Sequence, residues 1–158
     1  MVMIDEYGCE FYAGEAALIV RACAEGRWGE LRSGVAADAF VRFPRCVHGL
    51  DLLLLSAAIA NSTRRPEVVL SESVGTVAGD EGTWGADVLP GGWVESVAAV
   101  QPGQVGAVWQ YWVALHEREY GEDEEWDSPA VAVSLSGLVS LCQQALAGSR
   151  EVIWVWTQ

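Results

Sequence analysis

The sequence predicts one compact α+β domain over residues 1–158, mainly helical, with a small sheet that includes a buried C-terminal strand. Three observations favour this fold class. A length of 158 residues fits a single domain. A hydrophobic content of 51% is sufficient for a packed core. Two long segments have helical periodicity, and the chain ends in a short run that is apolar on both faces. An α/β layered arrangement is the alternative.

The clearest helix is expected from Pro102 to about Tyr120, where Gly121 ends the pattern. Its apolar side chains recur at intervals of three and four residues, which places them on one face of a helix. This stripe comprises Val105, Val108, Trp109, Trp112, Leu115 and His116.

A second long helix is expected from Pro129 to about Ala147. Ser128 is a favourable N-cap, proline suits the first helical position, and Gly148 follows the last turn. The residues expected on its buried face are Val131, Leu135, Leu138, Val139, Cys142, Ala145 and Leu146.

Further helices are expected at Ala13–Glu25 and Asp51–Asn61, and shorter ones at Trp28–Asp38 and Trp93–Val100. The Asp51–Asn61 segment is apolar on all sides, which is typical of a buried helix. Asp51 lies near its N-terminus, where a negative charge is favourable.

Strands are less well signalled. Glu151–Trp156 is apolar on both faces and is expected inside a covered sheet. Phe40–Phe43 alternates apolar and polar residues before Pro44, and Val68–Leu70 is a possible short strand. Ser71–Gly92 is rich in glycine and is expected to be a long loop.

The charge balance excludes several functions. The net charge is −13, and all nine basic residues are arginine. Without a lysine, Schiff-base chemistry and a P-loop are both excluded. Nucleic acid and anionic membranes are unfavourable partners for so acidic a chain, whereas a basic protein would be attracted to it.

The expected location is the cytoplasm, because the first residues do not form a secretory signal and the longest apolar run, Leu52–Ala60, is too short to cross a membrane. The four cysteines have irregular spacing, and Cys23 and Cys142 fall on apolar helical stripes. Core packing is therefore expected for the cysteines, rather than disulfide or redox chemistry. No cofactor or metal is expected.

The strongest candidate for a functional surface is the acidic segment, Glu117–Asp127. It holds seven acidic residues and one base, Arg118, so its net charge is 1 − 7 = −6. Such a run can dock a basic partner, with Trp126 as an aromatic anchor, or it can simply be solvated. Trp126 can also tuck back onto the core. The predicted partner-binding residues are Glu117, Glu119, Glu122, Asp123, Glu124, Glu125, Trp126 and Asp127.

The two histidines, His48 and His116, are candidates for catalytic or metal-ligating groups. His116 has acidic neighbours, but it ends an apolar stripe, which favours a hydrogen-bonded core histidine near a helix C-terminus. Cys46-Val47-His48 suggests a thiolate pair or two zinc ligands, yet zinc needs three or four. No serine-nucleophile elbow and no dinucleotide-binding glycine motif is present.

Three functional hypotheses follow. The first is an acidic interaction protein, such as an inhibitor or immunity-type protein that neutralises a basic partner. The second is a small-molecule binding module with a pocket lined by tryptophans near turns, namely Trp28, Trp84, Trp93 and Trp126. The third is an enzyme using His116, or Cys46 with His48. The sequence leaves the strand order and the oligomeric state open.

Overall fold

A computed structural model describes residues 8–45, 47–64, 76–80 and 84–157. Its centre is a five-stranded sheet in the order β2-β1-β5-β4-β3. All four pairings are antiparallel, which confirms the α+β class and distinguishes it from a parallel α/β sheet. The strands are β1 (Gly8–Gly14), β2 (Ala39–Phe43), β3 (Thr76–Asp80), β4 (Trp84–Val88) and β5 (Glu151–Thr157).

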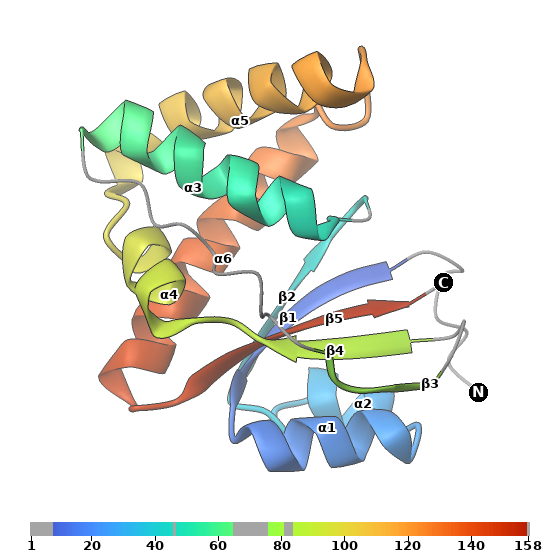
Figure 1. Cartoon of the computed structure of the whole chain (residues 1–158). Helices are drawn as coiled ribbons and strands as arrows, with labels where there is room; N and C mark the ends of the chain where they lie inside the picture. The colour runs from blue at the N-terminus through green and yellow to red at the C-terminus, as the bar shows by residue number, and fades with distance from the viewer. Residues whose placement is uncertain (1–7, 46, 65–75, 81–83, 158) are drawn as a thin grey trace.

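Helices cover both faces of the sheet (Figure 1). One face carries the short helices α1 (Ala16–Ala24) and α2 (Trp28–Arg32). The other face carries the larger group, in which α6 crosses the sheet and α3 and α5 lie side by side. These helices are α3 (Gly49–Thr63), α4 (Gly91–Ala98), α5 (Val105–Tyr120) and α6 (Pro129–Ala147), and a 3₁₀ turn at Pro102–Gln104 precedes α5.

The central strand β5 has the two apolar faces expected from the sequence. Val152 and Trp154 belong to the core beneath the larger helix group, whereas Ile153 and Val155 belong to the core beneath α1 and α2. All four side chains are buried. A strand that is apolar on both sides can lie only between two covering layers, and β5 therefore fixes the three-layer arrangement.

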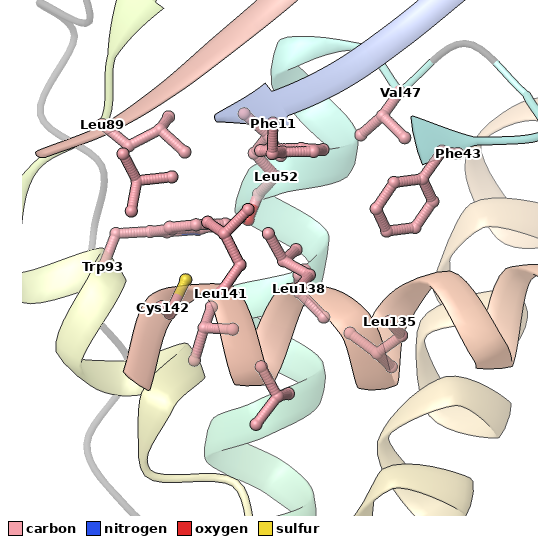
Figure 2. Close-up of a cluster of buried hydrophobic side chains, with 14 of the residues drawn as sticks. Phe11, Phe43, Val47, Leu52, Leu89, Trp93, Leu135, Leu138, Leu141 and Cys142 are labelled. Atoms are coloured by element: carbon pink, nitrogen blue, oxygen red, sulfur yellow. The ribbon is translucent and has the colours of Figure 1, made fainter. Parts of the chain in front are cut away.

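The larger core lies between the sheet and α6 (Figure 2). The ring of Trp93 stacks on Phe11 at 6.5 Å, and its indole N–H donates to the Leu52 carbonyl at 3.1 Å. Leu138 and Cys142 of α6 fill the same region. Trp93 thus links α4, β1 and α3 through a single large side chain.

Helix α6 is the only described helix long and apolar enough, by length and composition, to cross a membrane. The core helix of a soluble protein meets the same criterion. Here α6 has seven buried side chains and contacts β1, β2, β5, α4 and α5. The expected N-cap is confirmed, because Ser128 Oγ accepts a hydrogen bond from the Ala130 N–H at 3.2 Å.

The smaller face buries a charged group. Glu10 of β1 is 5% exposed and points towards the α1–α2 layer, where Arg32 of α2 donates to it through Nη2 at 2.5 Å and Nε at 3.3 Å. The Tyr12 hydroxyl donates to the same carboxylate. Three donors satisfy the buried carboxylate, so the cluster holds α2 against the sheet without an unpaired charge.

The structure corrects the expected loop at Ser71–Gly92. Strands β3 and β4 lie within it, and Gly91 already begins α4. Glycine and aspartate are poor strand formers, which hid these strands in the sequence. The strand pairing of β4 with β5 overrides that propensity. The possible strand Val68–Leu70 lies outside the described residues.

The N-terminal elements also differ from expectation. Ala13 belongs to β1, and the first helix begins only at Ala16. The sequence did not signal β1, because Glu10 and Tyr12 are buried on one face while Cys9 and Phe11 are buried on the other. A strand buried on both faces loses the alternation that identifies a half-exposed strand.

Gly85 provides a test of the sheet packing. A Cβ atom at this position of β4 would overlap the indole ring of Trp156, its partner on β5. We expect Gly85→Ala to lower the free energy of unfolding by about 1–3 kcal/mol through overpacking. Gly106→Ala is the matched control, because a Cβ there meets nothing within 4 Å and alanine favours the helix. Urea denaturation measures both; equal stabilities would contradict the proposed packing.

Candidate functional site

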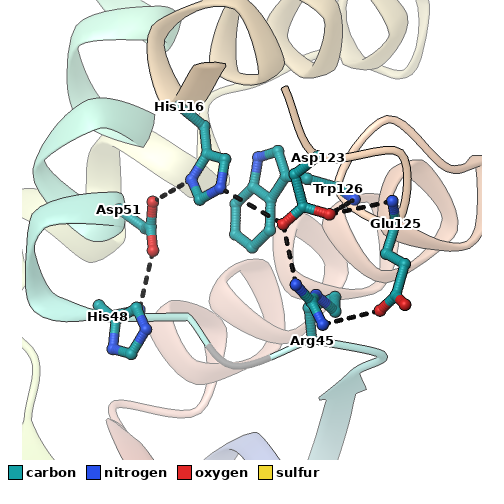
Figure 3. A network of polar contacts seen from close by, with 7 residues as sticks. All are labelled: Arg45, His48, Asp51, His116, Asp123, Glu125 and Trp126. Carbon is teal, nitrogen blue, oxygen red and sulfur yellow. Dashed lines mark hydrogen bonds and ion pairs between the residues drawn. The ribbon is translucent and has the colours of Figure 1, made fainter. Parts of the chain in front are cut away.

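The candidate site lies where the N-terminal end of α3 meets the C-terminal end of α5 (Figures 1 and 3). The two helices run antiparallel, so residues 65 positions apart become neighbours. Asp51 is in the first turn of α3, and one of its carboxylate oxygens accepts a hydrogen bond from the His48 N–H at 3.0 Å. This contact explains why α3 begins here: an acidic side chain at the third helical position satisfies the N–H of the N-cap residue.

The other carboxylate oxygen of Asp51 lies 2.8 Å from Nδ1 of His116. Asp51 is fully buried and His116 is 6% exposed. The backbone carbonyl of Asp51 also accepts a hydrogen bond from the Trp112 indole at 2.9 Å. The Asp51–His116 pair therefore joins α3 to α5 through a buried and well-satisfied polar contact, and the predicted hydrogen-bonded core histidine is confirmed.

Aromatic rings enclose His116. Its imidazole stacks on Trp126 with a centroid distance of 4.2 Å and lies 4.7 Å from the ring of Tyr120. Trp126 also packs edge-on against Trp112 at 5.0 Å. Trp126 is only 1% exposed. It therefore cannot serve as the exposed anchor considered from the sequence; it packs onto the core, which was the other possibility.

Arg45, from the connection between β2 and α3, forms ion pairs with the acidic segment. Its guanidinium contacts Asp123 Oδ2 at 2.9 Å and Glu125 Oε2 at 2.7 Å (Figure 3). Asp123 Oδ1 in turn accepts the Glu125 and Trp126 N–H groups at 3.1 and 3.4 Å. The hydrogen bond from Arg45 is the largest influence that lowers the pKa of the Asp123 carboxyl below its usual value.

The eight predicted partner-binding residues thus have unequal roles. Trp126 is buried, and Glu117 and Asp123 are half-buried. Glu125 is exposed but paired with Arg45. The remaining carboxylates are exposed and make no ion pair with a described residue; they are Glu119, Glu122, Glu124 and Asp127.

The same geometry bears on the catalytic hypotheses. Asp51 and His116 resemble a base with its orienting carboxylate, but Nε2 of His116 faces Asp123 at 3.8 Å rather than a nucleophile. Burial raises the pKa of the Cys23 and Cys142 thiols to about 12, so both are unreactive near neutral pH. Cys46 lies outside the described residues. Within the described part of the chain, no three His, Cys, Asp or Glu side chains are grouped to hold a metal ion.

The four tryptophans considered for a ligand pocket are distributed between the cores. Trp93 and Trp126 are fully buried in the larger core. Trp28 and Trp84 are half-buried and pack against the smaller core on the opposite face of the sheet. These positions do not bring the four rings together around one pocket.

Arg45, Asp51 and Tyr120 were not recognised as site residues from the sequence. Asp51 gave a partial signal, as an acidic residue at a helix N-terminus. Its contact with His116 and the contact of Arg45 with Asp123 join residues 65 and 78 positions apart. No local pattern could reveal these pairs.

Comparison with known proteins identified no relative. No protein-family model matches the chain, and no curated protein or solved structure matches it significantly.

The buried pair gives a stability prediction. Asp51→Ala removes the acceptor for His116 Nδ1 and for the His48 N–H, and we expect it to lower the free energy of unfolding by about 3 kcal/mol. Asp127→Ala, an exposed acid with no ion pair to a described residue, should change stability by less than about 0.5 kcal/mol. Urea denaturation at pH 7 compares the two; a similar small change in both would contradict the structural role of Asp51.

Asp123 gives a pH prediction. Its pKa is lower in the folded protein than in the unfolded chain, so its stabilising contribution is present above about pH 4 and is lost as the pH falls through the folded-state pKa. The stability difference between wild type and Asp123→Asn should therefore be largest at neutral pH and shrink below about pH 4. Arg45→Met should give the same trend. Urea denaturation from pH 7 to pH 2.5 measures it, and a constant difference would contradict the role of Arg45.

Proposed function

We propose that this protein binds a basic protein partner through the exposed carboxylates of the acidic segment, in the manner of an inhibitor or immunity-type protein. The observation that carries the proposal is that neighbouring acids differ in their contacts. Asp123 and Glu125 are held by Arg45, whereas Glu122 and Glu124 are exposed and make no ion pair with a described residue. The segment is thus fixed to the body while it presents negative charge to solvent.

Fixing the segment matters for binding. A flexible acidic loop must lose conformational entropy when a partner orders it, whereas a segment already held by Arg45 and by the buried Trp126 ring loses less. The net charge of −13 adds long-range attraction for a basic partner and raises the association rate at low salt. A cytoplasmic location is part of this proposal.

The test compares two double charge reversals that change the net charge by the same +4. Glu122→Arg with Glu124→Arg alters the acidic segment. Glu95→Arg with Glu151→Arg alters exposed acids on α4 and at the start of β5. Wild type and both variants serve as bait in a lysate of the source cells, and the captured protein is purified for binding assays at several salt concentrations.

We expect wild type and the control variant to capture the same basic protein, and the acidic-segment variant to bind it at least tenfold more weakly at low salt. The affinity should fall as salt rises, because the interacting charges are exposed. A captured protein that binds all three forms equally would overturn the proposal. The proposal would also fail if wild type captured only the proteins that the acidic-segment variant captures.

A further inference from the structure

Tyr120 is a large exposed side chain within the acidic segment. It ends α5, and 50% of its surface is exposed. Its ring is held in place from within the protein by the His116 imidazole at 4.7 Å, and His116 is itself fixed by Asp51 and Trp126. Tyr120 is therefore an exposed aromatic side chain with a firm support.

The surroundings of Tyr120 are acidic. Partial burial raises the pKa of its phenol, and the charges of Asp51 and Glu119 raise it further. Glu122 follows two residues later in the chain and is also exposed. Leu50, 40% exposed in the first turn of α3, lies at the same end of the α3–α5 pair. This end thus combines exposed apolar surface with exposed carboxylates.

The other exposed tyrosine of α5 has a different setting. Tyr111 is 37% exposed, but it lies nine positions before Tyr120, and this spacing places the two side chains on opposite faces of the helix. No Asp, Glu, Lys or Arg occurs from Val105 to Leu115. Tyr111 therefore provides an internal comparison for Tyr120 within one helix.

We propose that Tyr120 is the anchor of the docking surface and receives an arginine side chain of the basic partner, an inference that rests on the proposed function. A guanidinium group can stack on the aromatic ring and at the same time pair with a carboxylate in its plane. A lysine ammonium makes the ion pair but stacks less well. Tyrosine is also one of the residue types that dominate binding energy at protein interfaces.

The test uses two defined probes, acetylated and amidated hepta-arginine and hepta-lysine peptides, with the full chain. Isothermal titration calorimetry at low salt gives both affinities for each variant. Wild type and Tyr111→Ala should bind hepta-arginine about three- to fivefold more tightly than hepta-lysine. Tyr120→Ala should lose this preference, and Tyr120→Leu, which keeps apolar bulk without an aromatic ring, should lose it too. A melting curve of each variant confirms that it is folded.

The outcomes separate the anchor from the acidic segment. The role of Tyr120 as the anchor would be overturned if both Tyr120 variants still bound hepta-arginine more tightly than hepta-lysine. It would also be overturned if Tyr111→Ala lost this preference to the same extent as the Tyr120 variants. If Glu122→Arg with Glu124→Arg weakens both peptides while the Tyr120 variants keep the arginine preference, the docking surface stands and the anchor is wrong. If that double reversal leaves both affinities unchanged, the proposed function fails as well.

Discussion

The arrangement of this protein depends on the apolar character of both faces of β5. A strand of this kind is stable only when each face is covered, and the chain supplies a thin cover on one side and a thick one on the other. The thin cover, α1 and α2, is short and is reinforced by the buried contact between Glu10 and Arg32. The thick cover is built on α6, which contacts α4 and α5, and α3 packs against those two helices. The candidate site lies in this thick cover, where α3 meets α5.

Within the thick cover, two helix ends meet at the Asp51–His116 pair. Burying a carboxylate is costly unless its oxygens are satisfied, and here one accepts from a backbone N–H and the other from the imidazole. Because His116 is fixed, its ring offers a stacking surface for Trp126, and Trp126 in turn anchors the chain that follows α5. A polar contact in the core therefore decides the position of a surface segment several residues away.

The sequence predicted the elements whose signals are local. The periodicity of α5, the Ser128 cap of α6 and the two apolar faces of β5 all lie within single segments, and each was confirmed. The sequence did not predict β4. Gly85 is suited to this strand because the Trp156 ring of β5 fills the space beside it, and that contact joins residues far apart in the sequence. The site was predicted only as a run of acids. Which of them face solvent depends on Arg45, 78 residues before Asp123, and on the burial of Trp126.

The acidic segment alternates between carboxylates that Arg45 holds and carboxylates that are exposed. Solvation requires exposed charge but no fixed geometry, and like charges in an unrestrained loop would spread apart. Here Arg45 draws in Asp123 and Glu125, while the side chains between and before them, Glu124 and Glu122, are exposed and make no ion pair with a described residue. The ion pairs of Arg45 reduce the repulsion at Asp123 and Glu125, and under the proposed function a basic partner would do the same for the exposed carboxylates. This fixed geometry suits the proposed function, because a segment already held by Arg45 and by the buried Trp126 ring loses less conformational entropy when a partner binds.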